Sequence, residues 1–105
     1  MRKQTPESNV LEALCEYLSA RGYFFWRQNN GGVWNGSRFL PLPKYGMAGV
    51  SDLIVLHEGK AIFIEAKSDK GVQSPAQKEF QHFVETAGCT YFIARSIDHL
   101  TEAGL

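Results

Sequence analysis

Residues 50–67 read VSDLIVLHEGKAIFIEAK, in which two aliphatic runs of strand length flank the tripeptide His57-Glu58-Gly59. The two runs predict neighbouring β-strands. Glycine favours a two-residue turn at Glu58-Gly59, because hairpin turns of this kind need positive φ angles. With that turn, the strands form an antiparallel hairpin in which Asp52 lies directly opposite Glu65.

The predicted register gathers charged side chains at one end of the hairpin. Opposed residues share a face of the sheet, with Cβ atoms roughly 4.5–5.5 Å apart, and the two-residue period of a strand adds Lys67 to the face of Asp52 and Glu65. Two carboxylates this close repel each other unless a cation lies between them. We interpret the three residues as a divalent-metal site with an ammonium group beside it. The alternative is a plain Glu65–Lys67 ion pair at a strand end, with Asp52 merely opening its strand.

Both faces of the hairpin are apolar. The carboxylate face also carries Ile54, Leu56, Ala61 and Phe63, and the opposite face carries Leu53, Val55, Ile62 and Ile64. This pattern is typical of central strands in a sheet that is covered on both sides. Charged groups at the end of such strands are costly unless they are paired or bind a metal, which favours the functional interpretation.

The composition indicates one domain, 1–105, with enough apolar residues for a core but little surplus. The formal net charge is zero, which argues against a polybasic protein that holds nucleic acid by bulk electrostatics. No apolar stretch approaches membrane-spanning length, and the first residues lack the apolar core of a signal peptide. Cys15 and Cys89 are isolated, and no Cys/His spacing suggests zinc. We therefore expect a cytoplasmic protein with reduced thiols and no membrane partner.

Capping signals mark two helices. Thr5-Pro6-Glu7 supplies a capping threonine, a proline at the first helical position and an acid in the first turn, and this helix should end near Arg21, before Gly22. Ser74-Pro75-Ala76-Gln77 opens a second helix with a capping box, and Gly88 ends it. The apolar stripes are Val10, Leu11, Leu14 and Leu18 in the first helix and Phe80, Phe83, Val84 and Ala87 in the second.

The remaining segments complete a mixed fold. Residues 23–28 are aromatic-rich and strand-like, and Trp26 alternates with Phe24, which favours a place in the core. A further strand is expected at 90–95 and a short helix at 97–103. The glycine- and proline-rich stretch 29–51, with one short strand near 38–40, is longer than most incidental loops. The order helix, strands, hairpin, helix, strand predicts an α/β fold, a mixed β-sheet with flanking helices.

Three motifs carry more specific information: Gly49-Val50-Ser51-Asp52, Ile64-Glu65-Ala66-Lys67 and, at 74–80, SPAQKEF. Together with Pro6-Glu7-Ser8 and Arg27-Gln28-Asn29, they resemble the virus-type replication-repair nuclease (VRR-NUC) family of the PD-(D/E)xK nuclease superfamily, and the resemblance covers nearly the whole chain. It implies a restriction endonuclease-like core. It also implies a bacterial or phage protein that is homodimeric, as Holliday-junction resolvases are.

The same resemblance implies roles for the site residues. Asp52 and Glu65 would bind Mg²⁺ or Mn²⁺, with the Ala66 carbonyl as a further ligand, and Lys67 would orient the attacking water or help to deprotonate it. Hard cations prefer oxygen ligands, and lysine is a compact charge whose pKa shifts when it is desolvated. The resemblance also places Glu7 near the metal, often through water. The alternative for Glu7 is a favourable acid at a helix N-terminus.

Two further assignments stay open at this point. Gln77 completes the capping box, but it also precedes Phe80 by one turn and faces the sheet, which would allow a role near the attacking water. Basic residues on loops flanking the hairpin could track DNA phosphates, or each could be a solvated surface charge: Arg27, Arg38, Lys44, Lys70 and Lys78.

We therefore expect a metal-dependent endonuclease that hydrolyses DNA phosphodiester bonds, acting as a homodimer on branched or Holliday-junction-like DNA. The first alternative is a non-catalytic DNA-binding module on the same fold, against which the complete set of Asp52, Glu65 and Lys67 argues. The second is a sequence-specific restriction-type endonuclease, for which only the 29–51 loop could provide recognition. The third is a nuclease that acts on RNA, which the sequence does not exclude.

Overall fold

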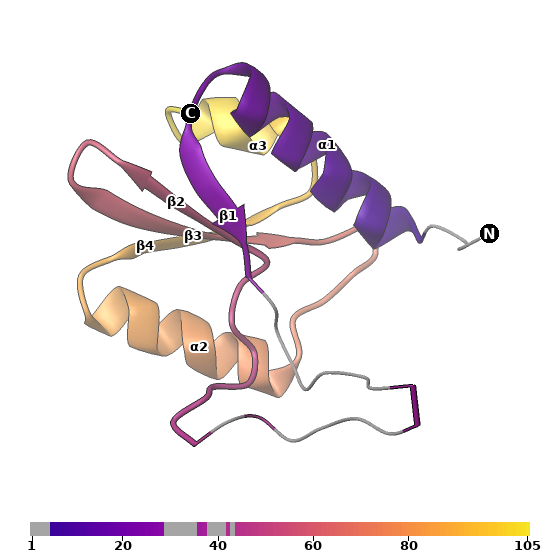
Figure 1. Ribbon diagram of the computed structural model, residues 1–105, viewed down its shortest axis with the longest axis vertical. Helices are drawn as coiled ribbons and strands as arrows, with labels where there is room; N and C mark the ends of the chain where they lie inside the picture. Colours follow the sequence, from indigo (N-terminus) through magenta and orange to yellow (C-terminus); the bar gives the residue numbers. More distant parts are fainter. Residues whose placement is uncertain (1–4, 29–35, 38–41, 43) are drawn as a thin grey trace.

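A mixed β-sheet forms the centre of the computed structural model, which describes residues 5–28, 36–37, 42 and 44–105 (Figure 1). Its strands in this part of the chain are β1 (Phe24–Arg27), β2 (Leu53–His57), β3 (Lys60–Ala66) and β4 (Thr90–Ala94), and they lie side by side in that order. β2 is antiparallel to both of its neighbours, whereas β4 is parallel to β3. β2 and β3 are therefore the central strands, as predicted.

Helices lie on both sides of this sheet. They are α1 (Pro6–Ala20), α2 (Pro75–Thr86) and α3 (Ile97–Glu102). Figure 1 shows α1 and α3 together on one side of the sheet and α2 on the other. Both long helices begin at the predicted caps, where the side chains of Thr5 and Ser74 accept hydrogen bonds from the N–H groups of Ser8 and Gln77. The predicted helices are confirmed, while the short strand expected at 38–40 lies outside the described residues.

The hairpin of β2 and β3 has the predicted register. Its pairs run from His57–Lys60 to Leu53–Ile64. The turn Glu58-Gly59 has φ angles of 51° and 76°, the left-handed conformation that a two-residue hairpin turn needs. Asp52 directly precedes β2, and Glu65 is the residue after Ile64. Their positions are therefore the next opposed pair of the same register.

The main core lies between the sheet and the helices α1 and α3. Its fully buried side chains come from all of these elements: Leu14, Leu18, Leu53, Val55, Ile64, Ala66, Ala94 and Leu100. Burying one large aliphatic side chain stabilises a fold by about 1.5–3 kcal/mol. This layer therefore anchors β2 and β3, from whose adjacent ends the charged residues project.

The opposite face of the sheet is covered only in part. α2 packs Phe80 against Phe63 of β3 and Tyr91 of β4, but Leu56 of β2 is 41% exposed. An α-helix is about 10 Å wide and neighbouring strands are about 4.8 Å apart, so one helix covers about two strands. The expectation that this face is covered throughout is wrong for β2.

Two further expectations are wrong because side chains on this face and on α2 are exposed. Phe24 and Trp26 share the face of Leu56 and are 66% and 38% exposed, so the expectation that Trp26 belongs to the core is wrong. Phe83 of α2 is 51% exposed and Ala87 is exposed as well. That helix contacts the sheet through a narrower stripe than predicted.

No helix among the described residues is long and apolar enough to cross a membrane.

Candidate active site

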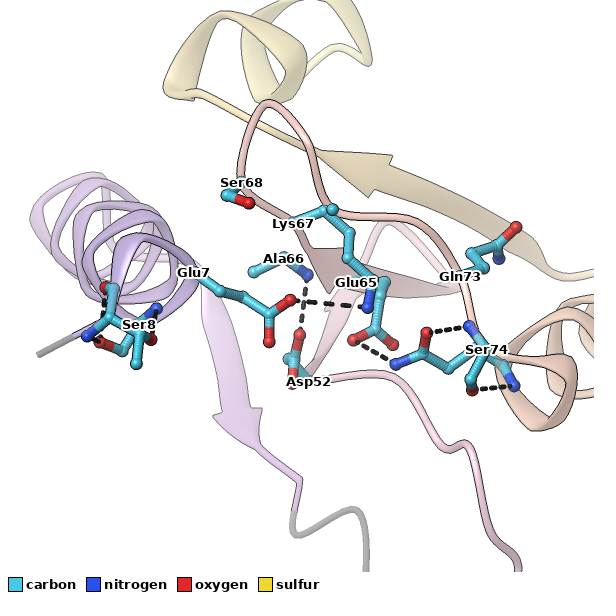
Figure 2. Close-up of polar contacts among 12 residues, drawn as sticks. Glu7, Ser8, Asp52, Glu65, Ala66, Lys67, Ser68, Gln73 and Ser74 are labelled. Carbon is cyan, nitrogen blue, oxygen red and sulfur yellow. Dashed lines mark hydrogen bonds and ion pairs between the residues drawn. The ribbon is translucent and has the colours of Figure 1, made fainter.

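Two carboxyl groups meet where β2 begins and β3 ends. The Oδ2 atom of Asp52 accepts a hydrogen bond of 2.8 Å from the backbone N–H of Ala66, which fixes the aspartate across the hairpin. Glu65 is only 1% exposed, and the carboxyl group of Asp52 lies close enough to raise its pKa. Figure 2 shows the two side chains together at this end of the hairpin, as the register predicts.

The surroundings of Glu65 disfavour its charged form. The pKa of Glu65 rises from 4.5 to about 9. Burial is the main cause, the neighbouring carboxyl group of Asp52 adds to it, and Lys67 acts in the opposite direction. Its Oε2 atom is buried and has no hydrogen-bond partner. A buried acceptor without a partner costs about 1–3 kcal/mol. A cation at this oxygen would remove that cost and would lower the pKa of the carboxyl group.

Lys67 brings a buried ammonium group to the same place. The residue is 7% exposed, and its Nζ atom lies 3.5 Å from Oε1 of Glu7. Glu7 stands in the first turn of α1, so this helix reaches the site through the ion pair (Figure 2). The part that Glu7 plays in metal binding stays a prediction.

Gln77 makes both kinds of contact that the sequence left open. Its Oε1 atom accepts a hydrogen bond of 2.9 Å from the N–H of Ser74, which closes the capping box of α2. Its Nε2 atom donates to Oε1 of Glu65 at 3.3 Å. An amide can do both because its oxygen accepts while its nitrogen donates. Gln77 therefore ties the start of α2 to the glutamate, while a role near the attacking water stays a prediction.

The segment before Asp52 packs against the start of α2 at Gly49, a contact that the sequence did not reveal. Gly49 has a φ of +78°, and a Cβ atom there would lie 2.3 Å from the carbonyl oxygen of Ala76. Only glycine allows so close an approach. Ser51 is fully buried and donates a hydrogen bond of 3.1 Å to the Leu53 carbonyl. In the sequence, the glycine was the only sign of this close approach, because its contact partner on α2 is known only from the folded chain.

The donor set suits a hard divalent cation. Asp52, Glu65 and the Ala66 carbonyl offer oxygen ligands, the kind that Mg²⁺ and Mn²⁺ prefer. In the part of the chain that the structure describes, no group of three or more His, Cys, Asp or Glu side chains is arranged to hold a metal ion, so a cation bound by two carboxylates would keep several waters. The buried Oε2 atom of Glu65, without a hydrogen-bond partner, is the observation that fits a cation.

The basic residues proposed to contact DNA lie in different structural elements and not all on the same face of the sheet. Arg27 lies in β1 and pairs with Leu53, whose side chain belongs to the core under α1, so the arginine is on the face opposite to the carboxylates. The expectation of a loop position is therefore wrong for Arg27, and also for Lys78, which lies in α2. The exposed candidates on the described residues include Lys44, Lys70 and Lys78. Arg38 lies outside those residues, and DNA contact stays a prediction for all five.

Comparison with known proteins identifies the fold. No family model and no curated protein matches the sequence. Seven solved chains match in structure, and one of them, described as a VRR_NUC domain, superposes with a TM-score of 0.67. That alignment covers 94% of this chain and 94% of the other, at 21% sequence identity. The chain therefore has the fold of a VRR_NUC domain, and the fold expected from the resemblance is confirmed.

Proposed function

We propose that this chain, built on the VRR_NUC fold, is a metal-dependent endonuclease that hydrolyses DNA phosphodiester bonds. One observation carries the proposal. The carboxyl groups of Asp52 and Glu65 are in contact, one glutamate oxygen is buried without a partner, and the buried ammonium of Lys67 is beside them. Such a cluster is costly to bury, and the core does not need it. The description of the structural neighbour as a VRR_NUC domain supports the same activity.

Each residue of the cluster has a defined task in this proposal. Asp52, Glu65 and the Ala66 carbonyl would hold Mg²⁺ or Mn²⁺, which when bound supplies Lewis-acid chemistry at the scissile phosphate. Lys67 would donate a hydrogen bond to the attacking water or to a phosphate oxygen, and Glu7 holds its ammonium group in place. The amide of Gln77 donates a hydrogen bond to Oε1 of Glu65, which leaves Oε2 of Glu65 for the cation.

We further propose that the substrate is branched DNA, such as a Holliday junction, and that two copies of the chain act together. The resemblance of the motifs supports this reading, and so does size, because a domain of 105 residues offers little surface for gripping two strands alone. Light scattering at micromolar concentration should report a dimer. A monomer both with and without DNA would count against the resolvase-like reading.

A cleavage panel tests the activity. Purified protein is incubated with single-stranded, duplex, flap and four-way-junction DNA, and with the matching RNA, in Mg²⁺, in Mn²⁺ and in a chelator. We expect metal-dependent cutting of the branched DNA that leaves 5′-phosphate and 3′-hydroxyl ends. Binding without cleavage under either ion would favour a non-catalytic DNA-binding module. Cleavage of RNA alone would favour the RNA nuclease.

A further inference from the structure

The turn that follows Lys67 is closed by Arg95, the residue directly after β4. Within this turn, 68–71, the N–H of Gly71 donates a hydrogen bond of 3.1 Å to the Ser68 carbonyl. The Nη1 atom of Arg95 donates to the same Ser68 carbonyl and also, at 2.9 Å, to the Gly71 carbonyl. One guanidinium group therefore fixes both ends of the turn.

The turn lies against the aliphatic part of Lys67. A Cβ atom on Gly71 would be 3.2 Å from the Cδ atom of the lysine, so the backbone of the turn is in contact range of the side chain. The N–H of Lys67 donates to the Ala94 carbonyl at 3.1 Å, one residue before Arg95. The lysine is thus fixed at its backbone by β4, along its side chain by the turn, and at its Nζ atom by Glu7.

We propose that Arg95 is a positioning residue for Lys67. By holding the turn 68–71 closed, it confines the flexible lysine side chain so that the ammonium group stays beside Glu65. Both hydrogen bonds come from the Nη1 atom. Arginine suits this task because the two N–H donors of that atom are held in the guanidinium plane, whereas the three donors of a lysine ammonium rotate freely. The catalytic meaning of the inference rests on the proposed nuclease function, whereas the confinement of the side chain does not.

Replacing Arg95 by methionine removes the donors and keeps an unbranched apolar stem. We expect the single-turnover cleavage rate to fall on the order of tenfold to a hundredfold, as small misplacements of reacting groups do, while DNA and Mn²⁺ affinities stay unchanged. Arg95→Lys should recover part of the rate. The control is Arg21→Met, because that guanidinium lies over the ring of Tyr17 beyond the end of α1.

A readout without substrate separates this inference from the nuclease proposal. In protein labelled with ¹³C-lysine, the Cε methylene of Lys67 should be more rigid than that of exposed lysines, and Arg95→Met should make it as mobile as they are. Gly71→Ala, whose Cβ atom would lie 3.2 Å from the Cδ atom of the lysine, keeps the guanidinium of Arg95 and should also disturb that signal. It replaces Arg95→Met if that variant does not fold.

The outcomes are distinct. If the parent cuts no DNA, the nuclease proposal fails, and the mobility of Lys67 alone decides this inference. A folded Arg95→Met protein that cuts within about twofold of the parent and leaves the mobility of Lys67 unchanged would overturn it.

Discussion

Replacing Glu65 by glutamine tests the electrostatics of the carboxyl pair without metal or substrate. In the folded chain, burial and Asp52 raise the pKa of Glu65 from 4.5 to about 9. Between these values the folded state holds a proton that the unfolded state has released, so stability must fall as the pH rises. Glutamine keeps the shape and can still accept the hydrogen bond from Gln77, but it does not titrate.

The size of the effect follows from this pKa difference. One proton bound only in the folded state changes the free energy of unfolding by about 1.4 kcal/mol per pH unit. From about pH 5 to about pH 7, the parent should therefore lose about 3 kcal/mol relative to Glu65→Gln. Saturating Mg²⁺ should oppose this trend, because the cation binds the ionised carboxylate and stabilises the folded parent more at higher pH.

Urea unfolding in a chelator, at steps from about pH 5 to about pH 8, measures the difference directly. Glu85→Gln, at an exposed glutamate of α2, is the matched control and should follow the parent at every pH. If the difference between the parent and Glu65→Gln stayed constant over this range, or changed in the opposite direction, the reasoning about a buried, protonated Glu65 would be refuted.

Other changes at the site have equally defined outcomes. Lys67→Ala should abolish cleavage and leave metal and DNA binding largely intact, because the ammonium acts on the attacking water more than on metal coordination. Calorimetry beside a cleavage assay checks this, and a loss of metal binding would contradict it. Gly49→Ala should lower the free energy of unfolding by at least about 3 kcal/mol, because its Cβ would lie 2.3 Å from the carbonyl oxygen of Ala76. Gly22 has the same φ of +78° but nothing within 4 Å, so Gly22→Ala should cost only about 1–2 kcal/mol. Equal costs in thermal melts would show that the clash is relieved. Mn²⁺ binding near neutral pH should release close to one proton from Glu65, and calorimetry in buffers of different ionisation enthalpy should detect it.

The hairpin and the helix starts could be predicted because their causes are local. The turn Glu58-Gly59 sets the register, and the register alone brings Asp52 and Glu65 together. Thr5 and Ser74 mark the first turns of α1 and α2 through contacts three residues away. Nothing beyond neighbouring residues is needed for these features, so the sequence pattern was sufficient.

The features that were missed depend on how distant elements pack. The exposure of Trp26 follows from the width of α2, which covers β3 and β4 and leaves much of that face of β1 open. The need for glycine at position 49 comes from its contact with Ala76. The sequence left a place for Gln77 at the site open, because its contact with Glu65 exists only where α2 begins beside the end of β3. No periodicity or capping rule encodes such distances.

The replacement of Asp52 by asparagine tests the metal-site assignment most directly. Asparagine can still accept the hydrogen bond from Ala66, but it removes one of the two carboxylates and the repulsion toward Glu65. Single-turnover cleavage of the best substrate is measured for the parent and for Asp52→Asn, with Mg²⁺ and with Mn²⁺. We predict that the folded variant binds metal weakly and cuts no faster than background with either ion. If it cuts as well as the parent with both ions, the assignment is contradicted, and Asp52 is a strand-end residue and nothing more.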